Sequence, residues 1–207
     1  MNYKKITIRS YDKTVKDYTK NVRNLHPKRE ATAFLSLLKR NSLILDLGCG
    51  PGRDAKIFSD KGLKVVGVDL SKNMILAAKK NAPRARFKVM DLTDLKLRDK
   101  SFDGIWAHMS FLHLSKKDLL MALKEAYRVL KRGGILYLSV KQGSGQKFLP
   151  DSRYKENIKK FWVFYQKDEI EQMLVKSGFR IMQSYVKTPK DSYSNAPKIF
   201  IFCQKEK

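Results

Sequence analysis

Three aspartates that end apolar stretches are the residues of this sequence whose types and spacing suggest shared chemistry. Asp46 is followed by the alternating glycines Gly48 and Gly50, and Asp69 and Asp91 end two further apolar stretches. Glycines after a strand let backbone N–H groups approach a ligand closely. A carboxylate beside them repels a pyrophosphate and attracts a ligand with an ammonium and a sulfonium group. The pattern therefore disfavours a nicotinamide dinucleotide, as does the departure from the G-x-G-x-x-G spacing.

Alternating strands and helices must position these aspartates. Strands are expected at 42–47, 64–68, 86–90, 102–107, 135–140, 179–187 and 198–203. Helices are expected within 1–26, from Pro27, at 52–61, from Ser71, from Ser115 through Leu130 to a stop at Gly133–Gly134, and from Asp168 to Gly178. This alternation predicts an α/β protein with a doubly wound, mostly parallel sheet, whose last two strands pair antiparallel.

One domain over 1–207 is the expected organisation, because the chain has 207 residues and 43% of them are hydrophobic. Residues 1–40 are expected to form an N-terminal helical cap. The weakly periodic segment 142–166 is interpreted as a loop that acts as a lid, since long unstructured segments are more often functional than idle.

The net charge of +24 invites a nucleic-acid hypothesis, but the basic residues are spread along the whole chain. A lysine-rich solvated surface is the alternative explanation. No apolar stretch is long enough to span a bilayer, and residues 1–6 lack the apolar core of a signal peptide. Cys49 and Cys203 are too few for a metal site or a disulfide framework, so a reducing cytoplasm is the expected location.

The carboxyl ends of neighbouring parallel strands meet at one edge of a sheet, and ligands bind there. Asp69 lies 17 residues beyond Gly52 and is suited to accept hydrogen bonds from ribose hydroxyls. Asp91 is suited to accept one from an adenine amino group. Leu70 and Leu92 follow these acids and are expected to sandwich the base.

Several motifs resemble class I S-adenosylmethionine-dependent methyltransferases. They are Leu45-Asp46-Leu47-Gly48-Cys49-Gly50-Pro51-Gly52, Gly67-Val68-Asp69-Leu70-Ser71, Met90-Asp91-Leu92, Phe102-Asp103-Gly104-Ile105-Trp106 and Leu130-Lys131-Arg132-Gly133-Gly134. The resemblance implies a Rossmann-like three-layer sandwich with a seven-stranded, mostly parallel sheet and one antiparallel strand. Stretches at 104–107, 110–113 and 139–143 also resemble a subgroup of small methyltransferases grouped with tellurite-resistance-type enzymes.

The resemblance also implies S-adenosylmethionine as the methyl donor and S-adenosylhomocysteine as the product. The residues expected to bind the donor are Tyr11, Tyr18, Asp46, Gly48, Cys49, Gly50, Asp69, Leu70, Met74, Asp91, Leu92 and Ala107. Within this set, Cys49 is expected to act chiefly as a small apolar filler.

On the acceptor side, His108 and His113 follow the fourth strand and Lys141 ends the fifth. Either histidine is a candidate general base, and Lys141 and Arg153 are candidates to bind an anionic substrate. Structural or surface roles are the alternative for all four. No Asn-Pro-Pro-Tyr follows strand 102–107, which disfavours methylation of exocyclic amino groups.

The predicted function is methyl transfer to the O, N or S atom of a small molecule, with anions among the candidate acceptors. The alternatives are an RNA methyltransferase, for instance one acting on tRNA, and a non-catalytic protein that binds S-adenosylmethionine. The sequence does not define the acceptor or the oligomeric state.

Overall fold

The computed structural model describes residues 2–151, 153–154, 158–188 and 196–206 of the chain. Its elements in chain order are α1 (Tyr3–Val22), α2 (Lys28–Ser36), β1 (Leu43–Leu47), α3 (Arg53–Asp60), β2 (Lys64–Asp69), α4 (Lys72–Asn81), β3 (Arg86–Val89), β4 (Phe102–His108), the short 3₁₀ helix η1 (Phe111–His113), α5 (Lys116–Val129), β5 (Leu130–Lys141), β6 (Gln146–Pro150), β7 (Lys159–Val163), α6 (Lys167–Lys176), β8 (Phe179–Lys187) and β9 (Lys198–Lys205).

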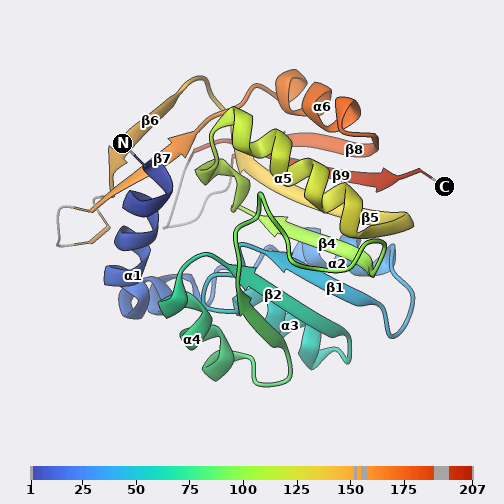
Figure 1. Ribbon diagram of the computed structural model, residues 1–207, viewed down its shortest axis with the longest axis horizontal. Helices are drawn as coiled ribbons and strands as arrows, with labels where there is room; N and C mark the ends of the chain where they lie inside the picture. The colour runs from blue at the N-terminus through green and yellow to red at the C-terminus, as the bar shows by residue number, and fades with distance from the viewer. Residues whose placement is uncertain (1, 152, 155–157, 189–195, 207) are drawn as a thin grey trace.

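Seven of these strands form one twisted sheet in the order β3-β2-β1-β4-β5-β9-β8 (Figure 1). Strands β1 to β5 pair in parallel, and β9 runs antiparallel to both β5 and β8. The predicted mostly parallel sheet with one antiparallel strand is therefore confirmed. The chain runs outward from β1 to β3 and returns to β4 beside β1, which opens a crevice at the carboxyl ends of these two strands.

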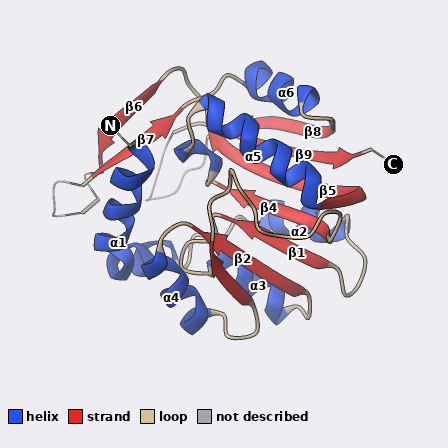
Figure 2. Ribbon diagram, in the orientation of Figure 1, coloured by secondary structure: helices blue, strands red, loops and turns tan. Residues whose placement is uncertain are grey.

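Helices cover both faces of the sheet, which completes the three-layer sandwich (Figure 2). Leu45 and Ile105 point to the face covered by α5 and α6, and belong to one apolar cluster. Their chain neighbours Ile44 and Trp106 point to the opposite face, where a second cluster includes Phe34 of α2 and residues of α3 and α4. Both faces of these strands are buried, as their continuous apolar runs predict.

Serine caps begin two helices where the sequence predicts them. The Ser71 hydroxyl accepts a hydrogen bond from the Met74 N–H at 3.0 Å, and the Ser115 hydroxyl accepts one from the Asp118 N–H at 3.2 Å. The Ser71 hydroxyl also donates to the Asp12 carboxylate at 2.5 Å, which links α4 to α1.

The expected continuation of the fifth helix to Gly133–Gly134 is wrong. Helix α5 ends at Val129, and Leu130 already pairs with Phe102 of β4. The register shifts between Phe102 and Gly104, so this pairing is separated from the main ladder that starts at Ile135. An irregular ladder of this kind has no simple period in the sequence, which explains why the strand was expected to begin only at 135.

The interpretation of 142–166 as a loop is also wrong. Strands β6 and β7 form an antiparallel hairpin in this segment, which lies beside α1 at the end of the sandwich where the parallel strands terminate (Figure 1). The Ser10 hydroxyl donates to the Lys159 carbonyl at 2.5 Å, and the Phe161 N–H donates to the Thr7 hydroxyl at 3.1 Å. These contacts with α1 stabilise the hairpin. Its strands show only a short alternation of apolar and polar residues, which is why the sequence does not indicate them. Its motion as a lid, and the closure of residues 1–40 over the site, stay predictions.

The described helices include none that combines the length and the apolar content needed to cross a membrane.

Candidate active site

A turn built on glycines connects β1 to α3. Gly48 and Gly50 adopt left-handed backbone conformations, with φ angles of 70° and 52°. A Cβ atom on Gly48 would lie 2.4 Å from the Cβ of Ser110, so this position also lacks space for a side chain. The alternating glycines therefore allow the tight turn that their spacing predicts.

Asp69, at the end of β2, organises this turn through its carboxylate. One oxygen accepts a hydrogen bond from the Gly50 N–H and the other from the Ser71 N–H, both at 2.9 Å. Burial raises the pKa of Asp69, although these two hydrogen bonds oppose the rise. Asp69 thus lies partly buried between the glycine turn and the N-terminus of α4.

Asp91, just after β3, is bound by Lys4 of α1. The Lys4 ammonium lies 2.9 and 3.2 Å from its two carboxylate oxygens, and the Thr93 N–H donates to one of them at 2.9 Å. Burial alone would raise the pKa of Asp91, but the hydrogen bonds from Thr93 and Lys4 lower it on balance. A ligand amino group would therefore share this carboxylate with Lys4.

A cavity of about 130 Å³ lies at these strand ends. We call it the smaller cavity; it is lined by Lys4, Thr7, Ile8, Tyr11, Tyr18, Gly48, Gly50, Asp69, Leu70, Met74, Asp91, Leu92, His108, Met109, Ser110, His113 and Leu114. The lining includes every residue predicted to bind the donor except Asp46, Cys49 and Ala107. It also includes residues of α1 that sequence reasoning missed, because α1 shows no pattern besides amphipathicity.

The three remaining predicted donor-binding residues lie beneath the cavity wall. Ala107 and Cys49 are buried in the two apolar clusters, one on each face of the sheet. Asp46 is also buried, and its Oδ2 atom has no hydrogen-bond partner among the described residues. Burial, reinforced by the nearby charge of Asp54, raises the pKa of Asp46 well above its usual value.

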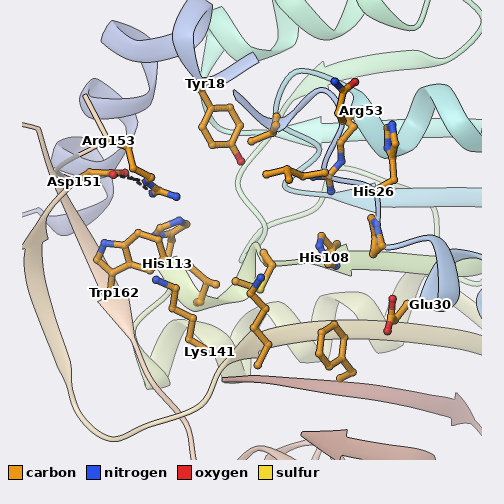
Figure 3. A pocket seen from close by; sticks show the side chains of 18 of the residues that line it. Tyr18, His26, Glu30, Arg53, His108, His113, Lys141, Asp151, Arg153 and Trp162 are labelled. Carbon is orange, nitrogen blue, oxygen red and sulfur yellow. Dashed lines mark hydrogen bonds and ion pairs between the residues drawn. The ribbon is translucent and has the colours of Figure 1, made fainter. Parts of the chain in front are cut away.

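A larger cavity of about 750 Å³ adjoins the smaller one. Tyr11, Tyr18, His108, Met109 and His113 line both cavities, and we call these five residues the shared wall. Figure 3 shows the larger cavity between the shared-wall histidines and charged side chains from several elements. Its basic lining residues are Lys28, Arg29, Arg53, Lys141, Arg153, Lys187 and Lys198, and its acidic ones are Glu30 and Asp151. Among described residues, the lining is therefore strongly positive.

His113 is held in one tautomer. Its Nδ1 lies 2.7 Å from the Phe161 carbonyl oxygen, which only accepts, so Nδ1 carries the proton. Its Nε2 lies 2.8 Å from the Tyr11 hydroxyl and accepts from it. Burial, with added repulsion from Lys160 and Lys141, lowers the pKa of His113 to about 3. His113 is therefore neutral at pH 7, with both ring nitrogens hydrogen-bonded.

His108 is partly buried and also makes polar contacts. Its Nδ1 lies 2.9 Å from the Tyr137 hydroxyl and 3.0 Å from the Ser139 hydroxyl. Burial, aided by the charge of Arg53, lowers the pKa of His108 to about 3 although Asp54 opposes the shift. His108 is therefore neutral at pH 7 as well.

Met109, the residue after His108, adopts a left-handed backbone conformation with a φ angle of 55°. Its N–H donates to the Ser139 hydroxyl at 3.0 Å and to the Ser139 carbonyl at 3.1 Å. A non-glycine residue in this conformation is uncommon and clusters at functional sites. Nothing in the sequence marks this strained position.

Four charged residues gather where β5 meets the hairpin; we call Lys141, Asp151, Arg153 and Lys160 the hairpin charge cluster. Asp151 accepts hydrogen bonds from Arg153 at 2.5 and 2.6 Å and from Lys160 at 2.8 Å. The Lys141 ammonium lies 3.8 Å from the ring centre of Trp162. Burial, then the charge of Arg153, lowers the pKa of Lys141 to about 8.

The sequence-predicted acceptor residues are thus brought together. His108, His113, Lys141 and Arg153 all line the larger cavity. Sequence reasoning missed Asp151 and Lys160, although Lys160 is fully buried. In the sequence, a lysine that is buried in the fold cannot be distinguished from a surface lysine before its partner is known.

Residues 45–138 match the family model described as a methyltransferase domain. This match covers less than half of the chain, and the sheet order agrees with the fold that the resemblance to class I S-adenosylmethionine-dependent methyltransferases implies. Among curated proteins, malonyl-[acyl-carrier protein] O-methyltransferase of Enterobacter lignolyticus is 31% identical over 111 residues. That alignment covers 53% of this chain and 43% of the relative, so the chain spans less than half the length of this curated relative.

Two solved structures have a similar fold. A methyltransferase of Methanosarcina mazei, described as S-adenosylmethionine-dependent, matches with a TM-score of 0.77 and 24% identity over 84% of this chain and 97% of the other. The second is the 1,6-didemethyltoxoflavin-N1-methyltransferase of Burkholderia thailandensis, solved with 1,6-didemethyltoxoflavin and S-adenosylhomocysteine bound. It matches with a TM-score of 0.78 and 20% identity over 99% of this chain and 89% of the other.

Proposed function

We propose that this chain transfers a methyl group from S-adenosylmethionine to a small molecule bound in the larger cavity. The observation that carries this proposal is the shared wall, because it brings two chemically different cavities together. The smaller cavity is lined by Asp69 and Asp91, and the larger one by an excess of cations. Methyl transfer is an in-line displacement, so alignment of donor and acceptor across such a wall supplies much of the rate.

The residues of the smaller cavity fit this donor. In this proposal Asp69 accepts hydrogen bonds from the ribose hydroxyls, and Leu70 and Leu92 contact the base; all three line the smaller cavity. The Oδ2 atom of Asp46 beneath the glycine turn has no partner among the described residues, and a cationic ligand group nearby would favour the ionised form of this carboxyl. When bound, the donor supplies an activated methyl group; the protein supplies its position.

Entry of the donor requires the smaller cavity to widen. Its volume of about 130 Å³ lies below the roughly 300–1,000 Å³ typical of ligand sites. Helix α1 supplies Lys4, Thr7, Ile8, Tyr11 and Tyr18 to the wall. We expect α1 to shift when the donor binds, which agrees with the expectation that residues 1–40 cover the site.

An anionic small molecule is the acceptor class that the larger cavity favours. The lining holds seven basic and two acidic residues among those described. The relative from E. lignolyticus is named for an O-methyltransferase and the neighbour from B. thailandensis for an N-methyltransferase, so both atom types remain open here. Membership of the tellurite-resistance-type subgroup and a cytoplasmic location stay predictions.

Calorimetric titration with S-adenosylmethionine and S-adenosylhomocysteine tests the donor half of the proposal. We expect both to bind, and Asp69→Ala to abolish binding. The exposed Asp94, outside both cavities, provides a matched control, so Asp94→Ala should bind normally. If the folded wild-type chain binds neither compound, the proposal is wrong.

Two alternative functions have their own tests. An RNA methyltransferase would bind bulk tRNA with affinity that falls steeply with salt, as phosphate contacts require. A non-catalytic binding protein would have no room for an acceptor beside the donor. The cavity of about 750 Å³ lined by His108, His113 and Lys141 favours an enzyme over this second alternative.

A further inference from the structure

Cations outnumber carboxylates among the described residues of the hairpin charge cluster. Its three cations, Lys141, Arg153 and Lys160, share one carboxylate among the described residues, that of Asp151. Arg153 and Lys160 both bind Asp151, whereas no described carboxylate lies within ion-pair distance of Lys141. Partly buried charge of one sign is costly without a counterion. An anion beside Lys141 would stabilise the cluster.

The cluster lies against the shared wall. The Trp162 ring, over which the Lys141 ammonium lies, is 4.7 Å from the His113 ring, centre to centre. The Lys160 ammonium lies 4.0 Å from the ring centre of Tyr11, whose hydroxyl is bound to His113. An anion bound by Lys141 would therefore lie within a few side-chain widths of the smaller cavity, where the methyl group must arrive.

The shared wall offers little general-base chemistry. His113 already uses Nδ1 for the Phe161 carbonyl and Nε2 for the Tyr11 hydroxyl, so accepting a further proton at Nε2 would break that contact. His108 is neutral, and its Nδ1 faces two hydroxyl groups. An alcohol would have to lose its proton to become a good nucleophile, and a histidine with a pKa of about 3 is a weak base for that step.

The other acceptor classes fit less well. An amine is protonated at neutral pH, so the cationic lining would repel it. A carboxylic acid is already ionised and needs no base, and Lys141 would attract it. We propose that the acceptor is a carboxylic acid, bound as its anion beside Lys141 and methylated on a carboxylate oxygen without a base from the protein.

This inference rests on the proposed function and deepens it. In the step, the carboxylate oxygen forms a bond to the methyl carbon while the carbon–sulfur bond breaks. The electron pair of that bond stays on sulfur, and no proton moves. The products are a methyl ester and S-adenosylhomocysteine, so the charges of the anion and the sulfonium cancel.

Malonate binding to the S-adenosylhomocysteine-loaded protein tests the anion site. We expect millimolar affinity for malonate and none for the neutral malonamide. Lys141→Met should weaken malonate binding about tenfold or more, since it removes a charge-assisted hydrogen bond. Lys141→Arg should retain binding. The control Lys147→Met removes an exposed charge from the same hairpin, outside both cavities, and should leave the affinity unchanged.

The pH dependence of malonate affinity adds a second measurement. Lys141 is faced by Asp151, Arg153, Lys160 and Lys198, and its pKa is about 8. Affinity should fall as the pH rises through about 8 in the wild type. The fall should be smaller in Lys141→Arg, because an arginine stays charged there. Equal malonate and malonamide binding, or full binding by Lys141→Met, would overturn the anion site.

Turnover then decides whether the carboxylate is the nucleophile. Small carboxylic acids, each paired with its amide, alcohol and amine, are incubated with S-adenosylmethionine, and methylated products are identified by mass spectrometry. We expect methyl esters of acids, reduced in Lys141→Met. Methylated alcohols or amines, or no ester from any acid although malonate binds, would overturn the inference. The proposed function fails separately, through loss of S-adenosylmethionine binding by the wild type.

Discussion

Removing the one carboxylate of the hairpin charge cluster should destabilise the protein more than removing one of its cations. Asp151 and Lys160 are the buried ion pair of the cluster, with side chains 3% and 0% exposed. In Lys160→Met, Asp151 keeps its two hydrogen bonds from Arg153. In Asp151→Asn, Lys160 and Arg153 both lose the negative charge of Asp151, while Lys141 remains nearby.

The expected losses in the free energy of unfolding follow from the charge contacts that each variant keeps. Breaking a buried ion pair by removing one partner costs about 3–5 kcal/mol, and we assign this range to Asp151→Asn. For Lys160→Met we expect about 1–3 kcal/mol, because Arg153 still compensates Asp151 and one repulsive charge is gone. The pKa of Lys160 is about 8, chiefly because burial disfavours its charged form.

The pH dependence of stability provides a second test of the charge argument. The unfolded chain holds the Lys160 proton to a higher pH than the folded chain, so stability rises with pH above about 8. Without Asp151 the folded pKa falls further, and the rise begins at lower pH. The penalty of Asp151→Asn should therefore be smaller at pH 9 than at pH 7.

Urea unfolding of the wild type and both variants measures these free energies, provided that the m-values agree. A larger loss in Lys160→Met than in Asp151→Asn would refute the charge argument. It would show that the contacts of the Lys160 ammonium with aromatic rings such as Tyr11 outweigh charge compensation.

Three further predictions concern the turn, the sheet face and the histidines. Gly48→Ala should cost clearly more stability than Gly62→Ala, measured by thermal unfolding: both have positive φ, which costs an L-residue about 1–2 kcal/mol, but only Gly48 would also press a Cβ against Ser110. Tyr185→Phe should cost about 1–3 kcal/mol in urea unfolding, because it removes the 2.9 Å hydrogen bond to the buried Glu30 carboxylate; no change would show that water replaces the hydroxyl. Stability should fall as the pH drops from about 6.5 toward 3, because the two shared-wall histidines bind protons more readily in the unfolded chain; replacing both by glutamine should flatten that part of the curve.

The smaller cavity, which we propose as the donor side of the site, could be predicted from the sequence because the patterns that indicate it are local. A strand that ends in an aspartate and turns on glycines is encoded within a few residues, and Asp46 with Gly48 and Gly50 shows all of it. The order of strands then places Asp69 and Asp91 at the same edge, since parallel strands share a direction. The predicted sheet and most of the cavity lining followed from these rules.

The acceptor side depended on contacts that have no local signal. Strands β6 and β7 are stable as a hairpin against α1, some 150 residues earlier in the chain, and not through their own periodicity. The ion pair of Lys160 and Asp151 is buried only because that packing excludes water from it. In the sequence, both residues belong to a charged stretch that looks solvent-exposed.

The sequence by itself determined the α/β sheet and the acidic, glycine-lined donor side, because apolar period and strand-end chemistry are properties of short segments. Only the tertiary structure decided that His113 is neutral and fully hydrogen-bonded, and that Lys141 lacks a described carboxylate partner. Protonation and charge compensation depend on burial and on neighbours from distant elements. These two properties are the observations that lead from the proposed methyl transfer to a carboxylic acid as the proposed acceptor.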